Sequence, residues 1–188
     1  MVSALSWLEP PAPPLLTREP GDGWVAAALR HDGLVGPTPT GDQAARDLLA
    51  SPEGRARLLR EVLVPGAALA RTTAVWVHTG RHLSGRTELV VPPERRVEGG
   101  GLVHRQHLAP GDVALVGAVP TTTPVRTAVD LLCFADRGTA LAGARALLAH
   151  GLAAEAVRQA LVQPVRRLPS RRGLSLLAEA LTPAGRHP

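Results

Sequence analysis

Arg126 and Asp130 are the two residues whose charges and spacing point most directly to chemistry. They follow Thr123 and Pro124, which predict the start of a helix, with Thr123 as N-cap and Pro124 at the first helical position. Residues four apart on a helix share one face, so the two side chains can form an ion pair. We predict that this pair holds the helix against the preceding strand, and a ligand-binding pair is the alternative.

Three other residues carry groups that catalysis or metal binding could use. His78 and His82 have a spacing that suits zinc, but Gly80 predicts the end of a helix between them, and neither an HExxH motif nor a third ligand is close. Cys133 follows apolar residues with no base beside it, so we predict a buried small hydrophobe. Residues 99–101 predict a flexible hairpin connection rather than a phosphate-binding loop. Since no catalytic motif is present, we expect no catalytic site, no metal and no cofactor.

Arginine clusters are the candidates for contact with the phosphates of duplex DNA. A solvated basic surface is the commoner role of such clusters. Single-stranded nucleic acid is not expected, because one Phe, three Trp and no Tyr leave few rings for bases to stack on. The predicted DNA contacts are Arg55, Arg57, Arg60 and Arg71 in one cluster, Arg166, Arg167, Arg171 and Arg172 in a second, and Arg105 on a predicted strand.

The composition of the 188 residues sets the class of protein. All 21 basic residues are arginine, and Lys, Ile, Asn and Tyr are absent, which indicates a GC-rich genome rather than selection for arginine. The net charge is +5, and its excess lies in residues 137–188, where eight Arg face two Glu. A single Cys, the absence of a long apolar run and the absence of a signal-like start favour a cytoplasmic protein without membrane contact.

Helical and extended patterns alternate along the chain. Residues 9–20 hold five prolines and predict an extended or disordered lead-in. Helical patterns cover residues 23–31, 42–49, 51–62 and 67–78, with a brief extended stretch at 33–41. Short strands are predicted at 87–91, 101–105, 113–116 and 118–121, where Pro120 suggests an edge strand. Leu and Ala then recur at helical spacing in residues 139–150, 153–162 and 173–181.

The order of these elements and their motifs resembles the actinobacterial AbiEi-type antitoxin family of type IV toxin–antitoxin systems. That family shows a motif like H-R-x-x-L-x-P-x-D-V followed by G-[VI]-P-V-T-[ST]-P-x-R-T-x-x-D-L. The resemblance covers about residues 51–181. The matching framework residues are His104, Arg105, Leu108, Pro110, Asp112 and Val113, then Gly117, Val119, Pro120, Thr122, Thr123, Pro124, Arg126, Thr127, Asp130 and Leu131.

The resemblance implies a winged-helix DNA-binding segment followed by a mixed α/β domain, in an antitoxin or transcriptional repressor. Some members also carry a nuclease-like C-terminal domain. This chain lacks the family's R-G-V-Y stretch after the winged helix, and without Lys it cannot supply the acid–acid–Lys site of such nucleases. We therefore expect a reduced winged-helix segment and no nuclease activity.

Together these patterns predict an α+β fold: a small, mostly antiparallel sheet packed by C-terminal helices and preceded by a short helical, degenerate winged-helix-like segment. The predicted divisions are a disordered lead-in at residues 1–22, the helical segment at 23–66, the AbiEi-like domain at 67–182 and a disordered tail at 183–188. The expected function is a non-catalytic antitoxin or transcriptional regulator with duplex DNA as partner. The alternative is a protein-interaction module that binds a toxin or another protein and has lost DNA binding.

Overall fold

A five-stranded mixed sheet and a smaller two-stranded hairpin organise the chain. The computed structural model describes residues 23–81, 86–97, 101–163 and 170–182. The predicted lead-in and tail, and Gly99 and Gly100, lie outside these ranges. The predicted α+β class is confirmed, because helices pack against a five-stranded sheet that contains both parallel and antiparallel pairs.

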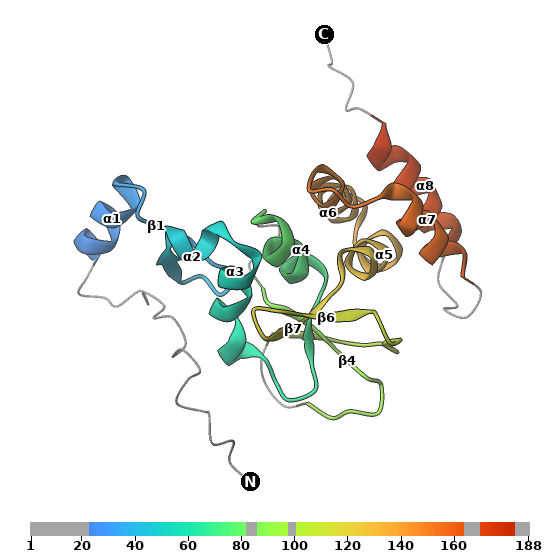
Figure 1. Ribbon diagram of the computed structural model, residues 1–188, viewed down its shortest axis with the longest axis horizontal. Helices are drawn as coiled ribbons and strands as arrows, with labels where there is room; N and C mark the ends of the chain where they lie inside the picture. Colours follow the sequence, from blue (N-terminus) through green and yellow to red (C-terminus); the bar gives the residue numbers. More distant parts are fainter. Residues whose placement is uncertain (1–22, 82–85, 98–100, 164–169, 183–188) are drawn as a thin grey trace.

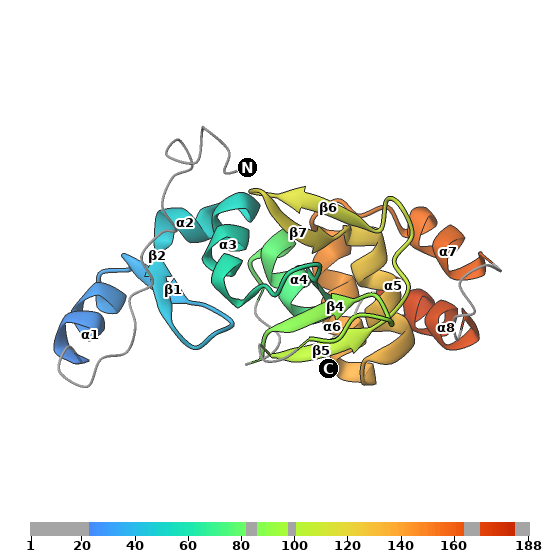
Figure 2. The same cartoon turned by 90° about the horizontal axis from the view of Figure 1, so that it is seen from below.

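The N-terminal part consists of short elements that extend the molecule along its long axis. Helix α1 is followed by a two-stranded antiparallel hairpin and by two short helices and a 3₁₀ turn. Figures 1 and 2 show α1 at one end of the molecule, set apart from the other helices. The elements are α1 (Gly23–His31), β1 (Val35–Pro37), β2 (Gln43–Ala45), α2 (Arg46–Ala50), α3 (Pro52–Leu58) and η2 (Arg60–Val62).

The larger sheet has the strand order β5-β4-β3-β7-β6. Its strands are β3 (Ala68–Leu69), β4 (Glu88–Val91), β5 (Leu102–Arg105), β6 (Val113–Val116) and β7 (Val119–Thr122). The pairs β3–β4 and β6–β7 are antiparallel, whereas β4–β5 and β3–β7 are parallel. The sheet is therefore mixed, not mostly antiparallel as the sequence suggested.

Local side-chain chemistry sets several of the helix starts and ends. Ser51 and Thr123 accept hydrogen bonds from the first turns of α3 and α5, each with Pro at the next position, and Gly80 ends α4 in the left-handed conformation. Asp136 caps α6 in the same way as Ser51. The helices are α4 (Arg71–Thr79), α5 (Pro124–Phe134), α6 (Arg137–Ala149), α7 (Ala154–Val162) and α8 (Ser170–Leu181).

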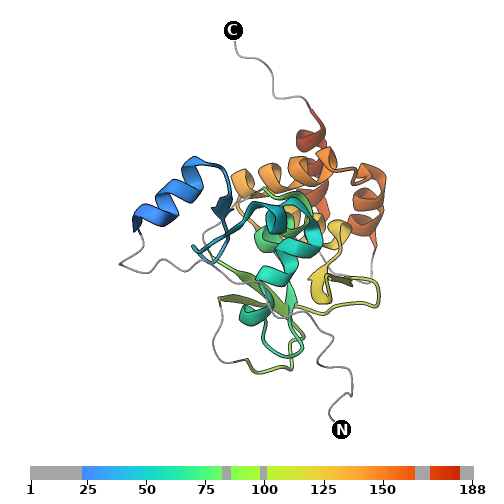
Figure 3. The ribbon, with the colours of Figure 1, turned by 60° about the vertical axis from the view of Figure 1, so that its left-hand side comes forward.

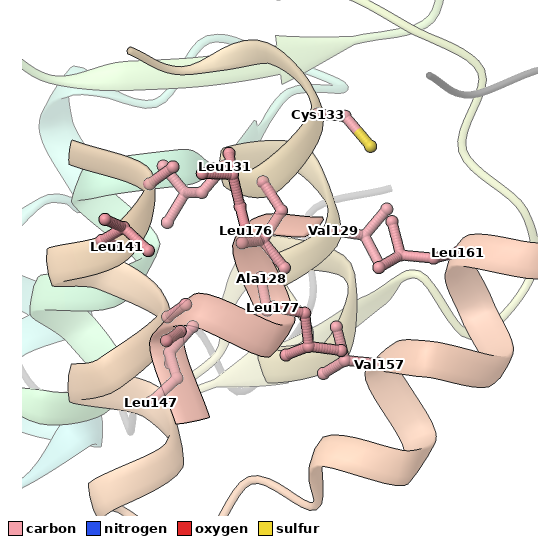
Figure 4. Close-up of a cluster of buried hydrophobic side chains, with 14 of the residues drawn as sticks. Ala128, Val129, Leu131, Cys133, Leu141, Leu147, Val157, Leu161, Leu176 and Leu177 are labelled. Atoms are coloured by element: carbon pink, nitrogen blue, oxygen red, sulfur yellow. The ribbon is translucent and has the colours of Figure 1, made fainter. Parts of the chain in front are cut away.

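Two larger clusters of buried apolar residues make the core. One joins α5 to α6, α7 and α8 through residues such as Leu131, Leu147 and Leu161, shown in Figure 4. The other joins α3 and α4 to the sheet, and it includes Leu59 and Leu89. Because Ala44 of β2 and the residues of α3 belong to the second cluster, the chain from β2 onward shares its core with the sheet.

Three sequence-based expectations about the sheet were wrong. Residues 67–70, predicted as the start of a helix, contain the central strand β3, whose neutral alanines are compatible with either element. The connection that ends at Gly101 is not a hairpin, because β4 and β5 run parallel. Strand β7 is internal despite Pro120, since β3 spans two residues and pairs with β7 only at Leu69↔Thr121.

Candidate functional site

Arg126 is the centre of a buried polar cluster at the N-terminal end of α5. Its Nε donates to Asp130 Oδ2 at 2.9 Å, and its Nη1 donates to Asp112 Oδ2 at 2.6 Å. Nη1 also donates to the His107 carbonyl at 3.0 Å, and Nη2 donates to Gln106 Oε1 at 2.9 Å. Arg126 is 6% exposed and Asp130 is 1% exposed. Burial lowers the pKa of Arg126, but the carboxylates of Asp130 and Asp112 outweigh it and raise the pKa above the ordinary value.

The connection between β5 and β6 is the segment that Arg126 holds. It joins the two outer strands of the sheet and passes its central strands, where Leu108 packs against Ala68, Ala70 and Val90. Three of the groups that bind Arg126 belong to this connection. The predicted ion pair of Arg126 and Asp130 is therefore present and buried, but Arg126 fastens α5 to the β5–β6 connection and not, as predicted, to the preceding strand.

The other family-motif residues on α5 and β7 also have structural contacts. Thr123 caps the helix by accepting from Arg126 N at 3.4 Å, and Thr127 Oγ1 lies 2.7 Å from Thr122 Oγ1. His78 Nε2 lies 2.8 Å from the carbonyl oxygen of Thr122. Burial lowers the pKa of His78 below its ordinary value. His82, the second residue of the zinc hypothesis, lies outside the described residues, and no group of three metal-binding side chains occurs within them.

Glu88 is the centre of a second polar cluster, which sequence reasoning missed. Its Oε1 accepts from Thr72 N at 3.3 Å and from Thr72 Oγ1, and its Oε2 lies 2.7 Å from His104 Nε2. Glu88 thus caps the first turn of α4, whose N-cap residue, Ala70, has no side chain able to do so. Burial would raise the pKa of Glu88, but hydrogen bonds from His104 and Thr72 outweigh it and lower the pKa.

A polar pocket of about 260 Å³ lies beside this cluster, with Arg71, Thr72 and Glu88 among its lining residues. Arg71 adopts a positive φ of 47°, uncommon for a residue with a side chain, and its guanidinium lies 5.6 Å from the ring centre of Phe134. The pocket is also lined by Arg86 and Asp136, so charges of both signs face it. It therefore shows no preference for a cation or an anion.

The arginines proposed for DNA contact have different positions. Arg55 is 6% exposed and donates from Nε to the Val77 carbonyl at 2.9 Å and from Nη1 to the Leu49 carbonyl at 2.6 Å, so it is not a surface residue. Arg172 donates to the Cys133 carbonyl at 2.6 Å and to the Ala135 carbonyl, which satisfies the C-terminal end of α5. Sequence reasoning missed both roles, because the partners are distant in the chain.

The remaining arginines of the two clusters are accessible or outside the described residues. Arg71 is half-buried at the pocket. Arg166 and Arg167 fall outside the described ranges. The exposed members are Arg57, Arg60 and Arg171, and Arg105, which belongs to neither cluster, is exposed on β5.

The surface of the described chain is strongly basic. Thirteen arginines are exposed against seven exposed carboxylates, while Glu88, Asp112 and Asp130 are buried together with Arg55 and Arg126. Such an excess attracts polyanions. Two exposed arginines, Arg137 and Arg158, lie in ion pairs with Glu179 and Glu155.

The thiol of Cys133 is buried and is not activated as a nucleophile. Cys133 is 4% exposed, and burial raises the pKa of its thiol to about 11, so the thiolate is scarce at neutral pH.

The described helices are all too short or too polar to cross a membrane.

Comparisons with protein-family models, with curated proteins and with solved structures found no match to this chain. The AbiEi resemblance therefore remains a hypothesis based on the motif residues.

Proposed function

We propose that the protein is a non-catalytic, AbiEi-like antitoxin or transcriptional regulator that binds duplex DNA. The observation that carries the proposal is the position of α1, which stands apart from the body and leads directly into the hairpin β1–β2 (Figure 3). A helix and a two-stranded ribbon are the two elements that the major groove of DNA admits. A helix followed by a hairpin is also the order expected at the end of a winged-helix segment.

Local hydrogen bonds hold the helix and the hairpin in a defined arrangement. At the hairpin tip, Thr40 Oγ1 lies 2.7 Å from Thr38 Oγ1 and donates to Asp42 Oδ2 at 2.7 Å. At the junction with α1, Arg46 Nη1 donates to the Gly33 carbonyl at 3.3 Å. These contacts limit the conformational entropy that would be lost on binding, which favours a preorganised surface.

Exposed arginines supply the expected phosphate contacts. Arg30 lies in the last turn of α1, and Arg46 begins α2, so both flank the hairpin. Arg57 is exposed on α3, the next helix along the chain. These three arginines lie in a segment where Asp32, Asp47 and Glu53 are also exposed, so the proposal needs the arginines to face the phosphates. Each neutralised phosphate adds to the salt dependence of binding.

A salt titration of binding to duplex DNA tests the proposal. We expect the affinity to fall steeply with salt, and the variant Arg30→Ala/Arg46→Ala/Arg57→Ala to lose about one unit of the log–log slope for each phosphate contact removed. The matched control is Arg158→Ala, which removes an exposed arginine already paired with Glu155. Absence of binding at low salt, or a slope that the triple variant shares with the wild type, would contradict the proposal.

A protein-interaction module is the second candidate, and the apolar surface at the same end favours it. Trp24 is 76% exposed on α1, and Leu34 is 56% exposed just before β1. Exposed aromatic residues of this kind often anchor protein interfaces. If this function holds, Trp24→Ser abolishes co-purification with a toxin expressed from a neighbouring gene and leaves DNA affinity unchanged. A loss of DNA affinity alone would favour the first candidate.

A further inference from the structure

The five-stranded sheet has two outer strands, β5 and β6, and they differ in how they are protected. Figure 2 shows β5 along one rim of the sheet and β6 along the opposite rim. Among the described residues, no strand pairs with either one on its outer side. An outer strand presents unpaired N–H and C=O groups, which proteins usually shield with charged residues, prolines or covering segments.

Strand β5 carries such protection, whereas β6 does not. Arg105 is exposed on β5, and His104 on the same strand is bound to Glu88. The four residues of β6 are Val-Ala-Leu-Val, without charge or proline. Leu115 is 72% exposed and Ala114 beside it is also exposed. An uncharged, apolar outer strand is a surface suited to pairing with another strand.

The hydrogen-bond pattern shows which backbone groups of β6 are available. Gly117 and Ala118 both have positive φ and form a two-residue hairpin turn. The pair that flanks such a turn, Val116↔Val119, is hydrogen-bonded. Along the two strands, bonded pairs then alternate with pairs that share no hydrogen bond. The bond from Thr123 N to the Asp112 carbonyl at 2.9 Å continues this alternation. The N–H and C=O groups of Val113 and Leu115 therefore point away from β7.

Both ends of β6 are fixed in position, which favours pairing because little further order is needed. The turn after β6 packs closely on α3: a Cβ at Gly117 would lie 2.6 Å from the Glu53 carbonyl oxygen. Before β6, Asp112 Oδ2 accepts from Arg126 and from Ala109 N at 2.8 Å.

Charge decides which partner suits this strand. Thirteen exposed arginines oppose seven exposed carboxylates on the described surface, so contacts between two copies that include this excess of arginines are unfavourable. Strand β6 lacks charged residues and can oppose its own copy without repulsion. We propose that the outer side of β6 pairs antiparallel with β6 of a second copy, giving a two-fold dimer with a continuous ten-stranded sheet.

Sedimentation velocity of the full chain at rising concentration tests this dimer without DNA. We expect the mass to rise from 19.6 kDa toward twice that value. Leu115→Lys places a charge at the centre of the pairing and shifts the transition to a concentration at least about tenfold higher. Leu181→Lys is the matched control, because Leu181 is 54% exposed on α8, and it keeps the wild-type curve. A wild-type chain that stays monomeric, an unaffected Leu115→Lys variant, or masses beyond a dimer would overturn the proposal.

Amide hydrogen exchange supplies a second, residue-level measurement. With rising concentration, exchange at Val113 and Leu115 slows, because their N–H groups become bonded across the new pair. Exchange at Ala114 and Val116 stays constant, because these groups already bond to β7. Concentration-independent exchange at Val113 and Leu115 would also overturn the proposal.

Discussion

The Arg126 cluster and the α1 end of the molecule use charged and apolar residues in opposite ways. In the Arg126 cluster, a guanidinium and two carboxylates are buried and joined by direct hydrogen bonds. At the α1 end, Trp24 and Arg30 lie in solvent, and α1 contacts little beyond the hairpin. Buried charges are costly unless paired, whereas exposed ones cost little and remain available to partners. The first region therefore holds the fold, and the second is the better place to bind a partner.

Arg126→Met is expected to have the largest effect on stability. It leaves Asp112 and Asp130 buried without their counter-charge, which typically costs about 3–5 kcal/mol in the free energy of unfolding. Urea denaturation followed by circular dichroism measures the loss. The control Arg158→Met breaks an exposed pair with Glu155 and leaves the midpoint unchanged. Similar midpoints for both variants would refute the structural role of the Arg126 cluster.

The turn between β6 and β7 allows two opposite changes at neighbouring positions. Gly117→Ala introduces a Cβ 2.6 Å from the Glu53 carbonyl oxygen at a positive φ, and we expect a loss of about 1–3 kcal/mol. Ala118→Gly relieves a residue with φ of 65°, so we expect a gain of about 0.5–1 kcal/mol. Thermal melts of both variants check the signs. Equal signs for the two changes would contradict the observed turn.

Glu88→Gln is expected to change how stability depends on pH. The folded-state pKa of Glu88 lies below its ordinary value, so its contribution to stability is present above that value and is lost as the pH falls through the folded-state pKa. The variant should be less stable than the wild type at neutral pH, and the difference should shrink in acid. Urea midpoints across the acidic range measure it, and a difference that is constant with pH would argue against an ionised Glu88 cap.

Trp24→Ala is expected to have the smallest effect. Because Trp24 is 76% exposed, its removal should change the free energy of unfolding by less than about 0.5 kcal/mol. Thermal unfolding of the full chain tests this, with Leu131→Ala in the core of α5 as the contrasting, strongly destabilising change. A large loss from Trp24→Ala would show that α1 supports the fold and would remove the contrast between the two regions.

The sequence predicted the local parts of the structure better than the long-range parts. The predicted helix starts at Thr123 and Ser51 were confirmed, as was the Arg126–Asp130 pair, because each depends on residues within one helical turn. The partners of Arg55 and Glu88 could not be predicted. The bond from Arg55 to Val77 joins residues 22 positions apart and the contact of Glu88 with His104 joins residues 16 apart, and no local pattern encodes either one.

The sequence predicted the start of α8 too late, at residue 173 instead of Ser170. By itself it determined where α5 begins and the apolar faces of α5 to α8. These depend on capping groups and residue period, which act over a few positions. Only the tertiary structure decided that β3 is the central strand, that β4 and β5 are parallel, and which arginines are buried. Strand order and burial depend on chain segments that meet only when the whole sheet has formed, so the same residue type serves as a helix cap at Arg172 and as a surface charge at Arg57.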